Sequence, residues 1–378
     1  MLRKLLILTA MLLCLTGCRA ETAEPPVKQP GKTVSPAVKV TIVPDRIAEH
    51  ISGMSDAQKV GQLFFARCPE TDAAGFVTQY QPAGLILFGR DFESRTPETL
   101  RAFLAECQSA AGLPLLVGVD EEGGTVTRIS GRDAFRAEKF RSPQAVFAAG
   151  GWEEIARDTS EKDSLLRSLG INVNLAPVAD VSTDPSDFIY ARAFGQGAEQ
   201  TAQYVSAVVR QMSDDSIGSV LKHFPGYGNN TDTHTGAVFD ERPMEAFREQ
   251  DFIPFAAAIQ AGADAVLVSH NVVLCMDDER PASLSPEVLK LLREDLGFDG
   301  AAVTDDMGMG AVGQYTDAAT AAVMAVNAGN DLIISSDLPN QYQAVLSAVE
   351  SGEIPAERLN EAVYRVLRWK RNIGIWKP

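Results

Sequence analysis

Residues 219–234 read SVLKHFPGYGNNTDTH, in which a short apolar segment runs directly into a loop rich in Gly and polar side chains. Lys222 and His223 end the apolar segment, and Asp232 and His234 follow within the loop. Glycine and proline set backbone turns that no regular element can make, so loop geometry holds these polar groups in place. Binding and catalytic groups are usually held in this way. The stretch therefore predicts a β-strand whose carboxyl end leads into a functional site.

Other apolar, β-rich segments lie on both sides of this stretch and alternate with helix-like segments. In chain order the predicted strands are Gln62–Ala66, Leu85–Phe88, Leu115–Val119, Val173–Ala176, Ser219–His223, Val266–Ser269, Ala301–Thr304 and Leu332–Ser335. Several are apolar throughout, as expected for a parallel sheet that helices cover. Eight strand-then-helix units in series favour an α/β fold, a single-domain TIM (β/α)8 barrel, over an open doubly wound sheet.

The segments between the predicted strands carry recognisable helix ends. Thr96 suits an N-cap with Pro97 at the first helical position, and Gly112 follows the end of that helix. Ser55 and Gln58 have the spacing of a capping box for the helix that leads into the first strand. Further predicted helices are Ala198–Met212, Pro286–Leu296 and a closing helix, Ala356–Trp369.

Polar residues follow the predicted strands at one end. In a TIM barrel the chemistry lies at the carboxyl ends of the strands. Those ends carry Asp120, Asp180, His223, His270 and Asp305. Two of the five have structural alternatives, since Asp180 could cap the following helix and His270 could fill a purely structural role. The set predicts a site at the carboxyl end of the barrel.

The N-terminal residues have the pattern of an export signal. Basic residues in Met1–Lys4 precede an apolar run over Leu5–Leu15, and small residues follow it. The ending Leu15-Thr16-Gly17-Cys18 resembles the bacterial lipobox, which implies lipidation of Cys18. An ordinary signal peptide with an incidental cysteine is the alternative.

The expected domain organisation follows from this pattern. Residues 1–18 form a lipoprotein-type signal peptide, and residues 19–45 form a flexible tether because they mix polar residues and Pro without periodicity. Residues 46–378 form the barrel. The protein is then exported and anchored by lipid to the bacterial cell membrane, facing outside the cytoplasm.

Charge and cysteine usage exclude several classes of partner. A net charge of −16 and a pI near 4.8 disfavour nucleic acid and anionic lipid. The cysteines outside the signal region, Cys68, Cys107 and Cys275, are widely spaced and indicate neither a disulfide framework nor a zinc site. We expect a monomer without a metal.

The loop sequence K-H-F-P-G-Y-G…D-T-H over residues 222–234 resembles the K-H-F-P-G-H-G…D-S-H signature of the β-N-acetylhexosaminidases in glycoside hydrolase family 3. Tyr227 stands where that signature has His, and Thr233 where it has Ser. Weaker similarities extend the resemblance over residues 54–374. It implies a retaining enzyme without an organic cofactor that removes terminal β-linked N-acetylglucosamine from muropeptide or chitin-type oligosaccharides.

The resemblance also implies catalytic roles. Thr304-Asp305-Asp306 matches the segment in which the family's nucleophile is the first aspartate, so Asp305 is the predicted nucleophile and Asp306 a structural residue. His234, with Asp232 two residues before it, makes a plausible acid/base dyad because imidazole exchanges protons near neutral pH. The alternative is that both are loop residues that bond local backbone groups.

Sugar binding requires side chains that grip hydroxyl groups. The sequence D-E-E-G-G-T-V-T-R over residues 120–128 resembles the family segment in which the first Asp and the Arg contact the sugar, which implies this role for Asp120 and Arg128. An arginine beyond a Gly-Gly turn could equally form a surface ion pair. A similar match assigns Arg192, and the predicted substrate-binding set is Asp120, Arg128, Arg192, Lys222 and His223.

Three rival functions remain. A β-glucosidase or β-xylosidase on the same barrel usually has a second domain that supplies a carboxylate acid. A phosphorylase is compatible with a His acid/base, because imidazole does not repel phosphate as a carboxylate does. A sugar-binding lipoprotein without turnover requires neither Asp305 nor the Asp232/His234 pair.

Overall fold

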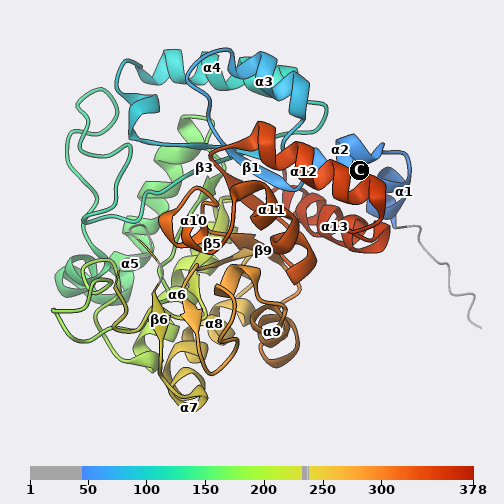
Figure 1. Cartoon of the computed structure of the whole chain (residues 1–378). Coiled ribbons are helices and arrows are strands. Elements are labelled where there is room, and N and C mark those ends of the chain that lie inside the picture. The colour runs from blue at the N-terminus through green and yellow to red at the C-terminus, as the bar shows by residue number, and fades with distance from the viewer. Residues whose placement is uncertain (1–44, 232–235, 237) are drawn as a thin grey trace, which may run out of the picture. The chain divides into compact units, whose positions relative to one another are not determined.

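The computed structural model describes residues 45–231, 236 and 238–378, which belong to one compact unit. Its main sheet is parallel and has the strand order β10-β1-β2-β3-β4-β5-β7-β9. Helices surround the strands (Figure 1). The strands are β1 (Phe64–Arg67), β2 (Gly84–Leu87), β3 (Leu116–Val119), β4 (Val173–Asn174), β5 (Gly218–Phe224), β7 (Ala265–Val268), β9 (Ala301–Thr304) and β10 (Ile333–Ser335).

The sheet closes between β9 and β10. A parallel bridge joins Val303 to Leu332, and the backbone N–H of Thr304 donates to the Leu332 carbonyl at 3.0 Å. This closure confirms the predicted TIM barrel, and its strands overlap the predicted segments in the predicted order. A two-stranded parallel sheet, β6 (Phe239–Asp240) with β8 (Val272–Val273), was not predicted.

Helices lie between successive barrel strands, as the sequence predicts, and further helices precede β1 and follow β10. They are α1 (Arg46–Ser52), α2 (Asp56–Gly61), α3 (Ala73–Tyr80), α4 (Pro97–Ala110), α5 (Pro143–Ser168), α6 (Ala198–Asp214), α7 (Met244–Ala246), α8 (Phe252–Gln260), α9 (Pro286–Lys290), α10 (Gly310–Tyr315), α11 (Ala318–Ala328), α12 (Leu338–Ser351) and α13 (Ala356–Asn372). Short 3₁₀ turns cover Gly89–Phe92 and Ala282–Leu284, and π turns cover Phe247–Asp251 and Leu291–Asp295.

The predicted helix starts are confirmed. Thr96 accepts from the Thr99 N–H with Pro97 at the first position of α4, and Ser55 and Gln58 form the capping box of α2. The predicted helix from Pro286 to Leu296 is α9 continued by a π turn, so it differs from prediction only in its hydrogen-bond spacing.

Alternate strand residues face two cores. Phe65 of β1 points into the barrel, whereas its neighbours Phe64 and Ala66 pack outward against the helices. The inner core also takes in Trp369 of α13, so this helix closes the amino-terminal end of the barrel. Gly218 at the start of β5 permits this approach, because a Cβ there would lie 2.7 Å from the indole nitrogen of Trp369.

The first and last helices of the described chain lie together, away from α10 (Figure 1). The Tyr364 hydroxyl of α13 donates to Asp45 at 2.8 Å, and the rings of His50 and Trp376 meet edge to face. Lys370 is buried beside them and donates to the Gln62 side chain at 2.7 Å. Burial lowers the pKa of Lys370 to about 7.

Among the helices that the structure describes, none combines the length and the apolar character that a membrane crossing requires. The predicted signal peptide, Cys18 and nearly all of the predicted tether lie outside the described residues.

Candidate active site

A cavity of about 260 Å³ opens at the carboxyl ends of the barrel strands. Its apolar floor includes Ile86, Leu175 and Leu267, which belong to the inner barrel core. Its polar lining contains every predicted site residue that the structure describes: Asp120, Arg128, Arg192, Lys222, His223 and Asp305. These residues lie far apart in sequence, so the barrel topology alone brings them together.

The loop after β3 supplies two of these side chains. Asp120 lies at the cavity, and the Nη2 atom of Arg128 lies 3.6 Å from its Oδ2. Between them Glu121 turns inward and is fully buried, where it accepts from the backbone N–H groups of residues 128, 129 and 130. Gly123 lies in the left-handed region at φ 102°, and a Cβ there would lie 2.2 Å from the Arg141 carbonyl oxygen. The loop after β3 is therefore folded around the carboxylate of Glu121.

Glu122 is a site residue that the sequence reasoning missed. Its buried carboxylate lies 2.5 Å from Lys222 Nζ and accepts from Arg192 at 2.8 and 3.0 Å. Burial alone raises the pKa of Glu122, but the charges of Lys222 and Arg192 outweigh it and hold the pKa at about 2. Lys222 also donates to Asp120 at 2.7 Å. Glu122 thus fixes two cationic residues of the predicted substrate-binding set.

Asp180 holds His223 from behind the cavity. Its carboxylate lies 2.7 Å from the ring Nδ1 and also accepts from the backbone N–H groups of His223 and Tyr227. Arg192 Nη2 lies 3.1 Å from the ring Nε2. Because a guanidinium only donates, this network assigns the lone pair to Nε2 and the proton to Nδ1. Asp180 is fully buried and orients a site residue, so the helix-cap alternative is wrong for it.

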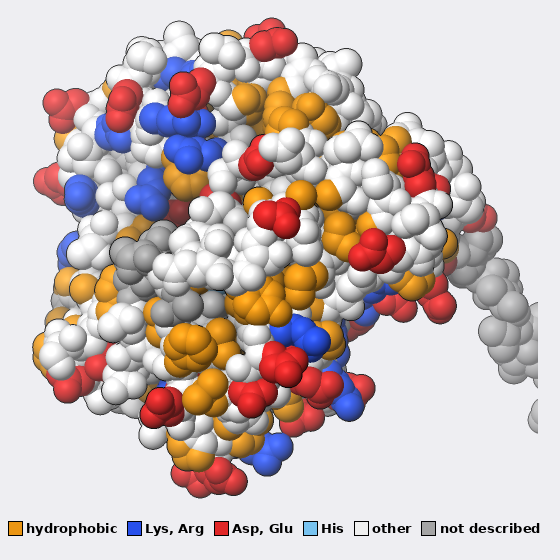
Figure 2. Space-filling view, in the orientation of Figure 1, with side chains coloured by type: hydrophobic (Ala, Val, Ile, Leu, Met, Phe, Trp, Pro, Cys, Tyr) orange, Lys and Arg blue, Asp and Glu red, His pale blue; other side chains and the backbone are white. Residues whose placement is uncertain are grey.

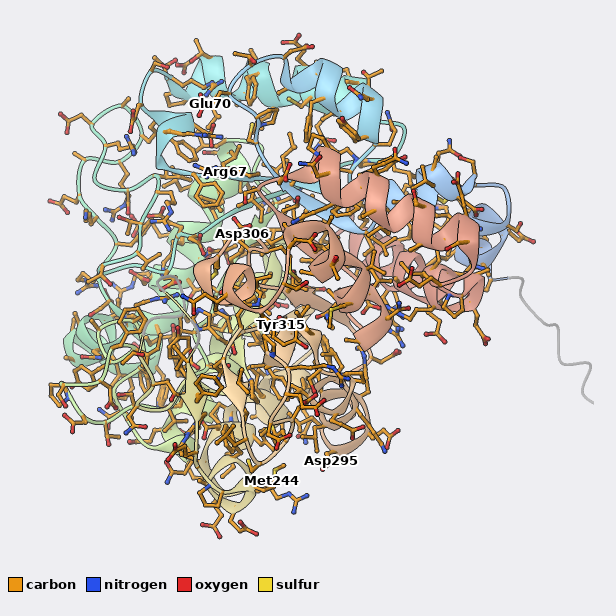
Figure 3. The ribbon with its side chains drawn as sticks, in the orientation of Figure 1. Arg67, Glu70, Met244, Asp295, Asp306 and Tyr315 are labelled. Carbon is orange, nitrogen blue, oxygen red and sulfur yellow. The ribbon has the colours of Figure 1, made fainter. Side chains whose placement is uncertain are left out.

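The two aspartates after β9 have different surroundings. Asp305 lies at the cavity and its Oδ1 accepts from the Asp306 N–H at 2.8 Å. Asp306 Oδ1 instead accepts from the Gly308 N–H and the Ser336 hydroxyl, both at 2.9 Å. Asp306, labelled in Figure 3, borders the cavity too, but its bonds to Gly308 and Ser336 hold the loop after β9 in its fold.

His270, at the end of β7, is fully buried. Its Nε2 lies 3.1 Å from the Asp306 carbonyl oxygen, which can only accept, and its Nδ1 lies 2.7 Å from the Ser283 hydroxyl. His270 therefore supports the backbone that follows Asp305, in keeping with the structural alternative for this residue.

Asp232 and His234 lie outside the described residues, so their predicted roles stay predictions. Within the described ranges no group of three or more His, Cys, Asp and Glu side chains has an arrangement that could hold a metal ion. Arg128, Arg192 and Lys222 bring donors to the described cavity, and Asp120 and Asp305 bring acceptors. This combination suits a polyhydroxylated ligand together with an anionic nucleophile.

Residues 56–369 match the family described as the glycosyl hydrolase family 3 N terminal domain. The chain belongs to this family. The match spans every described site residue, and it confirms the family that the sequence motifs predict.

Family 3 relatives of the chain carry hexosaminidase names. The chain is 30% identical over 391 residues to "Beta-hexosaminidase LpqI" of Mycobacterium tuberculosis (strain ATCC 25618 / H37Rv), with 97% of each protein covered. It is 33% identical to a "Beta-hexosaminidase" of Xanthomonas campestris pv. campestris (strain B100), over 78% of this chain and 84% of that protein.

Solved family 3 structures share the fold. A family 3 β-N-acetylglucosaminidase from Paenibacillus sp. str. FPU-7 superposes with a TM-score of 0.78 at 34% identity, covering 85% of this chain and 63% of that one. The structure titled "M tuberculosis LpqI" gives a TM-score of 0.78 at 28% identity, over 86% and 96% of the two chains.

Proposed function

We propose that the protein is a retaining β-N-acetylhexosaminidase that hydrolyses terminal β-linked N-acetylglucosamine. The observation that carries this proposal is that Asp305 lines the same cavity as the predicted hydroxyl-binding residues, two of which, Arg192 and Lys222, are held by Glu122. The names of its family 3 relatives support the same activity.

The chemistry has two steps. A carboxylate oxygen of Asp305 bonds to the anomeric carbon while the glycosidic C–O bond breaks and the leaving oxygen takes a proton from His234. Water then attacks the anomeric carbon and gives its proton to His234, and the bond to Asp305 breaks. The sugar leaves with its original configuration, and Asp232 orients the imidazole throughout.

The rim of the cavity favours an acidic aglycone, as in a muropeptide, over a neutral chitin-type one. Basic side chains gather on the face that carries the loops after β1, β2 and β3, although the whole chain is acidic (Figure 2). Arg67 stacks over Phe88, which lines the cavity, and Arg132 bonds the Arg128 carbonyl. Among the residues that the structure describes, neither Arg67 nor Arg132 forms an ion pair, so both charges can meet a carboxylate of the substrate.

One assay series tests the activity. Purified protein is offered aryl β-N-acetylglucosaminide and aryl β-glucoside, with and without phosphate, and the product is followed by NMR. We expect release of β-N-acetylglucosamine, little cleavage of the glucoside, and faster cleavage of N-acetylglucosaminyl-N-acetylmuramic acid than of chitobiose. A sugar phosphate as product would establish the phosphorylase instead, and binding without turnover would establish the sugar-binding lipoprotein.

His234→Ala should slow cleavage of a natural disaccharide far more than release of an activated nitrophenol. A positioned general acid contributes about 10² to 10⁴-fold, and most where the leaving group is poor. The kcat/KM values of the variant on the two substrates measure this difference. Equal losses on both would make His234 a binding or loop-structuring residue.

We further propose that the protein is exported and held at the bacterial cell membrane by lipid on Cys18, which the lipobox-like sequence supports. One acyl chain binds a membrane only marginally, whereas two or three hold a protein stably. Cys18→Ser should therefore move the protein from the membrane fraction to a soluble or unprocessed form, with the specific activity unchanged. If a radiolabelled fatty acid did not mark the wild-type protein, the anchor would be excluded.

A further inference from the structure

The side chain of Arg242 bonds to the chain on both sides of residues 232–237. It follows β6, and its Nε and Nη2 atoms donate to the Asp240 carboxylate at 2.8 to 3.0 Å. The same Nη2 donates to the Gly226 carbonyl oxygen at 3.0 Å, and Nη1 donates to Asp251 at 2.9 Å. The guanidinium also lies 4.2 Å from the centre of the Phe247 ring. One side chain thus contacts both the start and the end of the loop.

The glycines of the loop signature fit against this group. Gly228 has φ 54°, and a Cβ there would lie 2.4 Å from the Arg242 Cζ atom. Gly226 has φ 125°, and its Cβ would lie 2.2 Å from Asp251 Oδ1. The backbone of residues 226–228 therefore lies directly on the guanidinium and its carboxylate partner, an approach that only glycine allows.

Further bonds connect this arrangement to the sugar cavity. The Tyr227 N–H donates at 2.7 Å to Asp180, the carboxylate that also fixes His223. On the other side, the Asn230 side chain donates to Asp240 at 2.6 Å. The cavity wall and the described ends of the loop thus belong to one hydrogen-bonded network.

We propose that Arg242 is a positioning residue for proton transfer, because it fixes the two chain ends between which Asp232 and His234 lie in the sequence. This inference rests on the proposed function. A guanidinium carries five donors in a planar fork and can bond Asp240, Asp251 and the Gly226 carbonyl at once. A lysine ammonium is smaller and lacks that geometry. Arg242 itself touches no residue assigned to the sugar, so its loss should affect aglycone departure rather than sugar binding.

The test measures kcat and KM of Arg242→Ala and Arg242→Lys on aryl β-N-acetylglucosaminides of increasing leaving-group pKa. We expect a kcat loss of about 10² to 10³-fold on the poorest leaving groups, a large part of what a general acid supplies. Dinitrophenyl release, which needs little protonation, should change far less, and KM should stay close to wild type. Free guanidinium ion should restore part of the loss in Arg242→Ala.

Arg248→Ala is the matched control, because Arg248 lies nearby in sequence but its side chain is exposed. Its ion pair with Asp295 is long, at 3.7 Å, and also exposed. It should leave the leaving-group dependence unchanged. A loss of equal size on every substrate, with a parallel fall in melting temperature, would overturn the positioning role. If Arg242→Ala does not fold, Arg242→Lys decides between these outcomes. Failure of the proposed function is a separate result, because then the wild-type protein would cleave none of the series.

Discussion

Asp305→Ala should abolish turnover of β-N-acetylglucosaminides while the protein stays folded. In the proposed mechanism Asp305 forms the covalent bond in the first step, whereas Asp306, which also borders the cavity, is bonded to Gly308 and Ser336. We expect kcat to fall on the order of 10⁴ to 10⁶-fold, the range found when one member of a catalytic triad is removed. Activity is measured on an activated aryl substrate. Azide is added in a parallel reaction, because it can attack the anomeric carbon in place of the missing carboxylate.

Asp306→Asn is the matched control for this prediction. An amide keeps one oxygen that can accept from Gly308 and Ser336, so the loop should retain its fold and much of its activity. If Asp306→Asn were the more damaging change, with unaltered circular dichroism, then the nucleophile would be Asp306 and the assignment to Asp305 would be wrong.

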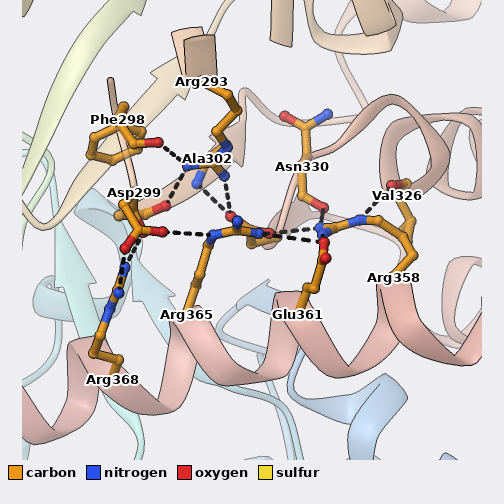
Figure 4. Close-up of polar contacts among 12 residues, drawn as sticks. Arg293, Phe298, Asp299, Ala302, Val326, Asn330, Arg358, Glu361, Arg365 and Arg368 are labelled. Atoms are coloured by element: carbon orange, nitrogen blue, oxygen red, sulfur yellow. Dashed lines mark hydrogen bonds and ion pairs between the residues drawn. The ribbon is translucent and has the colours of Figure 1, made fainter. Parts of the chain in front are cut away.

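Asp331→Ala should destabilise the barrel by about 3–5 kcal/mol in free energy of unfolding, the cost of removing one partner from a buried ion pair. Asp331 is fully buried just before β10 and accepts from Arg293 at 2.5 Å, Arg358 at 2.6 Å and Arg365 at 3.2 Å. Figure 4 shows these three arginines converging. Asp331 also accepts from the Ala302 N–H at 3.0 Å, beside the closure of the sheet. Urea unfolding followed by circular dichroism measures the change.

Asp299→Ala tests whether burial is the cause of the stability loss expected for Asp331→Ala. Asp299 belongs to the same arginine cluster and lies near Arg365 and Arg368, but its side chain is 73% exposed (Figure 4). An exposed ion pair contributes at most about 1 kcal/mol, so this variant should unfold close to wild type. Comparable losses in the two variants would contradict the argument from burial.

The barrel could be predicted because each strand is a compact apolar segment that ends in a polar residue or a turn. The errors in the predicted strands lie at an element boundary and in elements that are very short. The sequence predicts a first strand from Gln62, but Gln62 is the C-cap of α2 and turns its amide inward to Lys370 and to the carbonyl of Gln81. The strands β6 and β8 are two residues long, too short for periodicity to show.

The sequence predicts which described polar side chains meet at the cavity, but not the contacts that support them. Asp120 and Lys222 were identifiable from their motifs, whereas Glu122 looked like one of three adjacent acidic residues. The alternation of the chain was the available signal, since it sends Asp120 and Glu122 to one side and Glu121 to the other. The role of Asp180 depends on its 2.7 Å contact with His223, which lies 43 residues further along the chain. The spacing of motifs does not show which residues far apart in the sequence will be in contact.

The contact between Asp45 and Tyr364 has a practical consequence. It places the beginning of the described chain beside α13, at the end of the barrel opposite the sugar cavity, and Trp376 near the last residue lies there too. A bead, a chip surface or a fusion partner coupled at Asp45 or at the C-terminus would then leave the entrance of the cavity unobstructed. Immobilised molecules should process oligosaccharides from the surrounding liquid without shielding one another, even at high packing density.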